Sequence, residues 1–250
     1  QTIPIVFIGV ADPIGSGFIA TAARPGGNVT GFSNIEPAIG GNDTIYGNAG
    51  DDIILGGVNG SSDTLYGNDG DDIIFGDNGE IMLKGGIIAQ IHTTDTEEST
   101  GGIDTISGNY GNDIIFGGVN GDSIYGNDGN DIILGDNGLL RYDVDGETAA
   151  NLSTLDLVET QDTGLGGVDI IHGNADDDVI LGETNGDTLY GDQGNDVVLG
   201  DFGRITLVAG IFREVTVTDN TEGGVDTIYG GSEEDILAGG AFGDIIDGNA

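Results

Sequence analysis

The stretch GNDGNDIIL, residues 126–134, decides the fold of this chain, because it is one of a series. Within it, six residues that favour turns precede three apolar residues. Closely similar copies are GNAGDDIIL (47–55), GNDGDDIIF (67–75) and GNYGNDIIF (108–116). Looser copies are GGVNGDSIY (117–125), GETNGDTLY (182–190), GDQGNDVVL (191–199) and GGAFGDIID (239–247). One copy alone would be typical of a polar loop, whereas a series in phase predicts a repeat architecture.

The first six residues of each unit suit a hard cation. Gly at the first, second and fourth positions permits a positive φ and a close approach of the backbone, which turns carbonyl oxygens inward. Asp at the sixth position adds a carboxylate beside them. Such a cage of oxygens favours Ca²⁺ over Mg²⁺, which keeps its water and requires a stricter octahedron. Alternatively, an Asp in a Gly-rich turn only caps its own backbone, although stacked carboxylates without a cation would repel one another.

The units fit the pattern G-[GN]-x-G-x-D-x-U-x, where U is apolar, and the chain resembles the RTX, or hemolysin-type, calcium-binding repeat family over residues 40–250. The resemblance implies an all-β fold, a parallel β-roll in which two nonamers form one coil. It also implies that each ion lies between turns stacked on the same side of the roll, so that multiple Ca²⁺ ions are the expected cofactors.

The predicted metal ligands are the sixth-position aspartates and backbone carbonyls of the glycines in the turns. The aspartates are Asp43, Asp52, Asp63, Asp72, Asp104, Asp113, Asp122, Asp131, Asp169, Asp178, Asp187, Asp196, Asp226, Asp235 and Asp244. The carbonyls are those of Gly47, Gly50, Gly67, Gly70, Gly108, Gly111, Gly126, Gly129, Gly173, Gly191 and Gly194. The resemblance pairs Asp52 with Asp72, Asp113 with Asp131 and Asp178 with Asp196, and it places Asp122 and Asp187 on the opposite side.

A longer period is superimposed on the nonamers. Shortened units open super-repeats at residues 40–100, 101–165, 166–222 and 223–250. These units lack two turn residues, so we expect their turns to offer fewer oxygens. GDNG or GDFG closes the first three super-repeats, and inserts follow at residues 80–100, 139–165 and 204–222. The first and third inserts alternate or run apolar around a central Gly, which predicts β-hairpin insertions about every 60 residues; the middle insert is less clear.

The strands of the two predicted sheets differ in their outward residues. Odd strands, such as Thr-Ile-Tyr at 44–46, have Thr and Tyr beside a central apolar residue, whereas even strands, such as Ile-Ile-Phe at 73–75, are apolar throughout. Side chains alternate along a strand, so the even sheet would present a large apolar outer face. We expect the inserts, or self-association with a second copy of the chain, to cover it. The alternative is that partial exposure of this face is tolerated.

Residues 1–39 form a separate segment. The stretch that begins TIPIVFIGVADPIGSGF, within residues 2–38, resembles a fragment of the periplasmic substrate-binding proteins of ABC transporters. This segment is a fusion remnant, an accident of sequence assembly, or a piece that packs on the roll or on a neighbouring copy. The apolar run within this segment is too interrupted to span a membrane. A lone strand and helix cannot form a ligand cleft, so a small-molecule receptor is disfavoured.

The net charge and the absence of catalytic motifs exclude several classes of function. The net charge of −39, from 44 acidic and 5 basic side chains, disfavours nucleic acid and anionic membranes as partners and favours cations. His92 and His172 are isolated, and neither an H-E-x-x-H nor a G-x-S-x-G motif occurs, so we expect no enzyme. The sequence predicts a secreted or cell-surface, extracellular structural or adhesive protein that folds on calcium and assembles into a fibre or surface layer. The alternative is the calcium-folded region of a larger secreted enzyme, toxin or adhesin.

Overall fold

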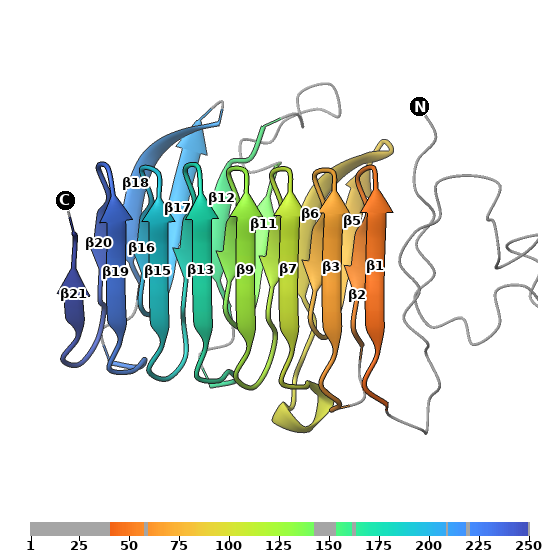
Figure 1. Cartoon of the computed structure of the whole chain (residues 1–250), viewed down its shortest axis with the longest axis horizontal. Coiled ribbons are helices and arrows are strands. Elements are labelled where there is room, and N and C mark those ends of the chain that lie inside the picture. Colours follow the sequence, from red (N-terminus) through yellow and green to blue (C-terminus); the bar gives the residue numbers. More distant parts are fainter. Residues whose placement is uncertain are drawn as a thin grey trace, which may run out of the picture.

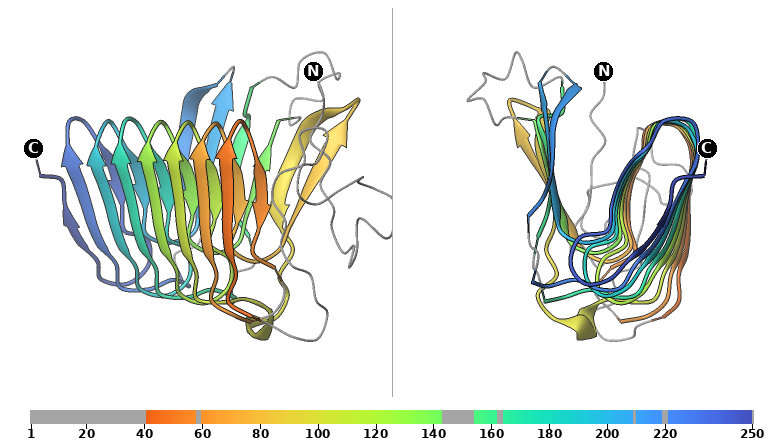
Figure 2. Two further views of the ribbon diagram at one scale, coloured as in Figure 1. Left: turned by 45° about the vertical axis from the view of Figure 1, so that its right-hand side comes forward. Right: turned by 90° about the vertical axis from the view of Figure 1, so that its left-hand side faces the viewer.

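The computed structural model describes residues 41–57, 60–142, 154–161, 164–208, 210–218 and 221–249, so the N-terminal segment lies outside the described residues. Over these ranges the chain forms a parallel β-roll of two sheets with a third sheet along one side (Figures 1 and 2). The predicted all-β parallel roll is confirmed. No helix in the described part has the length and apolar character needed to cross a membrane.

Each coil of the roll contributes one strand to each of two parallel sheets. The first sheet contains β1 (Thr44–Ala49), β3 (Thr64–Asp69), β7 (Thr105–Tyr110), β9 (Ser123–Asp128), β13 (Ile170–Ala175), β15 (Thr188–Gln193), β19 (Thr227–Ser232) and β21 (Ile245–Asp247). The second sheet contains β2 (Ile53–Leu55), β4 (Ile73–Phe75), β8 (Ile114–Phe116), β10 (Ile132–Leu134), β14 (Val179–Leu181), β16 (Val197–Leu199) and β20 (Ile236–Ala238). Equivalent residues pair in register, as Ile45 does with Leu65, so successive coils superpose along the roll.

The core of the roll is built from the central residue of each strand, as the alternation of side chains predicts. These residues point inward from both sheets and are almost all fully buried. They are Ile45, Ile54, Leu65, Ile74, Ile106, Ile115, Ile124, Ile133, Ile171, Ile180, Leu189, Val198 and Ile228, with Leu237 packed against them.

The outer face of the first sheet carries the predicted Thr and Tyr side chains in columns. The ring of His172 stacks between Tyr125 and Tyr190, with centroids 5.4 and 4.2 Å away, and Tyr190 stacks in turn on Tyr229 at 4.9 Å. His172 is therefore a member of a surface column of rings, as its outward strand position predicts, and its Nδ1 lies 2.9 Å from Asp192.

The inserts form one continuous antiparallel third sheet. It contains β5 (Gly79–Lys84) and β6 (Ile87–Thr93) from the first insert, β11 (Gly138–Arg141) and β12 (Leu157–Thr160) from the second, and β17 (Gly203–Val208) and β18 (Ile211–Val217) from the third. The predicted hairpins are present in the first and third inserts. The sequence did not predict that neighbouring inserts pair, as β6 does with β11 and β12 does with β17. A short 3₁₀ turn, η1 (Glu98–Thr100), ends the first insert.

The third sheet covers the apolar outer face of the second sheet. One row of side chains crosses all six of its strands and points to the roll: Ile81, Ile91, Leu140, Val158, Ile205 and Val215. Beneath it, Phe75 and Phe116 stack at 4.9 Å and are only 1% and 0% exposed. The prediction that the inserts cover this face is confirmed for most of the second sheet, although Ile114 and Ile132 keep partial exposure and Ile236, on the last strand of the sheet, is 50% exposed. Because the third sheet occupies most of this face, little of it is left for self-association with a second copy.

The spacing of the inserts has a geometric cause. Strands in a sheet lie about 4.8 Å apart, so each coil advances both roll sheets by that distance. A super-repeat contains two coils, which add two strands to each roll sheet, and one insert, which adds two strands to the third sheet. The three sheets therefore lengthen at the same rate, which explains why the inserts recur after every second coil.

Candidate metal sites

The sixth-position aspartates stand in two columns, one at each edge of the roll. The first column lies in the turns that lead to the second sheet and contains Asp52, Asp72, Asp113, Asp131, Asp178, Asp196 and Asp235. The second lies in the returning turns and contains Asp43, Asp63, Asp104, Asp122, Asp169, Asp187, Asp226 and Asp244. The predicted pairs are neighbours in the first column, and Asp122 and Asp187 lie in the second, as expected.

One carboxylate oxygen of these aspartates closes a ladder between coils. The backbone N–H of Asp72 donates to Oδ1 of Asp113 at 2.7 Å, and the N–H of Asp113 donates to Oδ1 of Asp131 at 2.8 Å. The same bond repeats through both columns, so an aspartate caps the backbone of the preceding coil rather than its own. The capping alternative thus accounts for one oxygen of each linked carboxylate.

The other oxygen, Oδ2, is buried and has no hydrogen-bond partner. This holds for Asp72, Asp104, Asp113, Asp122, Asp131, Asp169, Asp178, Asp187, Asp196, Asp226 and Asp235. A buried charged oxygen that lacks a partner is strongly unfavourable, because its lost hydration is not replaced. The buried Oδ2 atoms therefore form a repeated series of positions that suit a positive group.

Glycine allows the backbone to approach the Oδ2 atoms closely. A Cβ placed on Gly67 would collide with Oδ2 of Asp72 and with the carbonyl oxygen of Gly108 on the next coil. The same arrangement surrounds the Cα atoms of Gly47, Gly108, Gly126, Gly173 and Gly191 in the first column. Each of these glycines therefore has a carboxylate oxygen and a carbonyl oxygen beside it, and both are ligand types that Ca²⁺ prefers.

The predicted carbonyls are distributed around these glycines. Those of Gly67, Gly108, Gly126, Gly173 and Gly191 face the first-position glycine of the preceding coil. Those of Gly50, Gly70 and Gly111 face the fourth-position glycine of the following coil. Gly47, Gly129 and Gly194 lie in the same turns, packed against a neighbouring carbonyl. In the described residues, no three acidic, His or Cys side chains are placed so that they could hold one metal ion together, so carbonyl oxygens would supply much of any coordination shell.

The three shortened units that follow an insert are not deficient, which corrects the expectation of fewer oxygens for them; the first shortened unit begins outside the described residues. A Cβ on Gly76 would meet Oδ2 of Asp104 and the carbonyl oxygen of Gly117, although the whole first insert separates Gly76 from Asp104 in sequence. Gly135 with Asp169 and Gly200 with Asp226 repeat this arrangement across the other inserts. Each of these second-column turns is therefore a complete turn that the insert divides into two halves.

Three aspartates that the sequence did not single out hold the divided turns together. Oδ1 of Asp77 accepts from the N–H of Gly102, after the insert, at 2.9 Å, and Oδ2 accepts from the N–H of Val119, on the next coil, at 2.8 Å. Asp136 and Asp201 make the equivalent pairs of bonds at the second and third inserts. The signal was present in the sequence, since each is the second residue of GDNG or GDFG.

The columns are electrostatically unfavourable for bare carboxylates. Burial, assisted by neighbouring carboxylates, raises the pKa of Asp113 to about 7, of Asp131 to about 8 and of Asp178 to about 9. Burial and the adjacent Asp169 carboxylate hold the pKa of Asp122 well above its ordinary value. These carboxyls therefore favour either a proton or a cation close to Oδ2.

These pKa shifts predict an inverted pH dependence in the absence of calcium. Unfolded Asp has a pKa of about 3.9, so at neutral pH the folded chain retains protons at Asp113 and Asp131 that the unfolded chain has lost. Stability should consequently fall as pH rises from about 4 to about 8. Thermal unfolding in calcium-depleted buffer, followed by circular dichroism, measures this trend. Saturating calcium should abolish it, and a calcium-free stability that rises over this range would contradict the assigned burial of the columns.

The comparisons with known protein families agree with this geometry. The family model for the RTX calcium-binding nonapeptide repeat matches residues 40–59, 58–80, 98–133, 117–138, 163–198 and 220–250. The residues between these matches coincide with the strands of the third sheet. The model for the ABC transporter substrate binding protein matches residues 1–40, in agreement with the resemblance of the N-terminal segment. A search of curated proteins finds no match. The repeats cover more than half of the chain, and the chain belongs to the RTX calcium-binding nonapeptide repeat family.

Proposed function

We propose that Ca²⁺ ions occupy the two columns, each held by Oδ2 of sixth-position aspartates and by carbonyl oxygens of the stacked turns. The observation that carries this proposal is the regular series of buried Oδ2 atoms without partners. The divided turns supply equivalent positions at Asp104, Asp169 and Asp226. Calcium would neutralise the carboxylates there and join coils that otherwise repel one another.

Calcium binding would be coupled to folding, because neither column exists in the unfolded chain. With a net charge of −39, the calcium-free chain resists compaction. Extracellular calcium modules bind at roughly 10⁻⁴ to 10⁻³ M, so such a chain stays unfolded at low calcium and folds after export. We therefore assign the roll an extracellular role as a structural or adhesive element that calcium stabilises. A fibre or surface layer of copies would use surfaces other than the covered second sheet.

A second candidate function is the calcium-folded part of a larger secreted enzyme, toxin or adhesin. The isolation of the two histidines favours a supporting role for the roll itself. His172 belongs to the ring column of the first sheet, whereas His92 lies in the third sheet with Nε2 3.5 Å from Glu80. Any chemistry of such a protein would be located outside the roll.

The test is a calcium titration of the purified chain followed by far-UV circular dichroism. We expect a strand spectrum to develop cooperatively with a midpoint at roughly 10⁻⁴ to 10⁻³ M Ca²⁺, and to disappear on addition of a chelator. Mg²⁺ at the same concentration is the control and should produce little strand signal. A strand spectrum that is unchanged by the chelator would end the proposal.

A further inference from the structure

The distal ends of two insert hairpins expose a concentration of apolar side chains. The first tip, at the β5–β6 turn, comprises Met82, Leu83, Lys84 and Ile87, and the second, at the β17–β18 turn, comprises Val208, Ile211, Phe212 and Arg213. Leu83 is 53% exposed and Ile211 is 60% exposed, and the other apolar members are similarly uncovered. Nothing in the roll core or beneath the third sheet requires these residues to be apolar.

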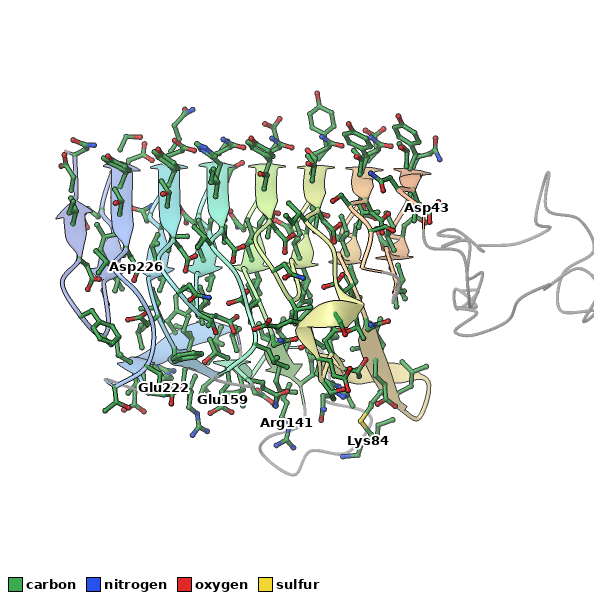
Figure 3. All side chains as sticks on the ribbon, turned by 90° about the horizontal axis from the view of Figure 1, so that it is seen from below. Asp43, Lys84, Arg141, Glu159, Glu222 and Asp226 are labelled. Atoms are coloured by element: carbon green, nitrogen blue, oxygen red, sulfur yellow. The ribbon has the colours of Figure 1, made fainter. Side chains whose placement is uncertain are left out.

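The two tips also differ in charge from the rest of the molecule. Residues 81–94 and 202–213 contain no acidic side chain, although the chain has 44 of them. The same two stretches hold three of the five basic side chains: Lys84, Arg204 and Arg213. Figure 3 shows Lys84 and Arg141 on the third-sheet side, pointing away from the roll. Each apolar tip therefore carries a cation on an otherwise acidic protein.

The hairpins direct both tips toward one plane. β5 and β18 are the two edge strands of the third sheet, and both hairpins extend past the turns of the roll in the same direction (Figure 1). In the strand order β18-β17-β12-β11-β6-β5, four strand spacings of about 4.8 Å separate the centres of the two hairpins, so the tips stand about 19 Å apart. The turns are short: Gly85 and Gly86 have φ of 64° and 85°, and Gly210 has φ of 73°. Both apolar hairpin tips can therefore contact one flat surface at the same time.

We propose that these tips dock the calcium-folded chain on a zwitterionic phospholipid surface. The apolar side chains would enter the boundary between headgroups and acyl chains, and Lys84 and Arg213 would contact phosphate groups at the level of the headgroups. The chemistry favours lipid over a protein partner, because a typical protein interface buries about 800 Å² of one continuous patch on each partner. The tips instead form two small, separated contacts. The net charge of −39 disfavours an anionic membrane and therefore selects a surface without net charge.

The test is flotation with phosphatidylcholine vesicles at millimolar calcium, with circular dichroism to verify folding of every sample. We expect the wild-type chain to float with the vesicles and the double variant Leu83→Ser, Ile211→Ser to lose at least about tenfold in apparent affinity. The matched control is Ile103→Ser, Val225→Ser, which changes two equally exposed apolar residues on turns of the roll. This control should bind as the wild type does.

Each of three outcomes would overturn the proposal. These are a folded wild-type chain that does not float, equal binding by the tip and control variants, and lipid-free dimers in sedimentation that only the tip variant abolishes. The last outcome would identify a second copy as the occupant. Because folding is measured separately, a chain that fails to fold with calcium would contradict the proposed function instead, and the two failures are distinguishable.

Discussion

Replacing Asp131 by Asn is expected to raise the calcium concentration for half-maximal folding by about tenfold or more, because the number of charged ligands tunes calcium affinity. Asn preserves an Oδ1 that accepts the N–H of Asp113, now at 2.8 Å, but replaces the buried Oδ2 by an amide nitrogen. In calcium-free buffer the same change should stabilise the fold, since it removes a buried carboxyl whose pKa is about 8. The substitution therefore destabilises the fold when calcium is present and stabilises it when calcium is absent.

The matched control for this variant is Asp128→Asn, in the same turn. Asp128 is exposed at the end of β9, so the substitution removes the same charge without touching the column. Calcium titrations of both variants by circular dichroism provide the comparison. Similar midpoints for the two variants would mean that the interior carboxylates only cap the backbone.

Deleting residues 101–165 should yield a shorter chain that still folds on calcium, whereas deleting only residues 117–134 should be much more damaging. The longer deletion removes two coils together with one insert, so all three sheets shorten by two strands. Asp77 could then accept from the N–H of Gly167 as it does from that of Gly102, and β17 could pair with β6. Thr93 Oγ1, which accepts from Gly138 at 3.1 Å, would meet the equivalent Gly203.

The shorter deletion removes one coil and no strand of the third sheet. Only one coil would then separate the first insert from the second, so the roll would lengthen by one strand spacing, about 4.8 Å, between them. The third sheet requires two strand spacings there, because each insert contributes two strands. We expect the third sheet to detach in part, with increased binding of an apolar dye and a thermal midpoint lower by at least about 10 °C. If the chain lacking 117–134 were as stable as the chain lacking 101–165, the account of matched spacing would be wrong.

The nonamers carried enough information to predict the roll. Their turn and strand residues alternate so regularly that Ile133 could be placed inward and Ile132 and Leu134 outward from sequence alone. The hairpin inserts followed from apolar runs around Gly85, Gly86 and Gly210. The columns of aspartates followed from the stacking of turns, because equivalent residues of successive coils must superpose. These features depend on local pattern and repetition, which a single sequence displays directly.

Features that depend on contacts across an insert were not predictable in this way. A whole hairpin separates the two halves of a divided turn in sequence, as it separates Gly76 from Asp104. In the sequence, the second half therefore resembles a unit that lacks turn residues. The double role of Asp77 arises from contacts with two segments distant in sequence. Pairing between inserts depends on the pitch of the roll, which determines how far apart their first strands lie. Each case requires three-dimensional placement rather than a sequence pattern.

The most direct test of the central claim is a crystal structure at millimolar calcium with anomalous diffraction measured at a long wavelength. The account predicts calcium peaks in both columns, including the divided turns at Asp104, Asp169 and Asp226, with Oδ2 and carbonyl oxygens about 2.3–2.6 Å from each ion. The same folded roll with no ion beside Oδ2 in either column would contradict it.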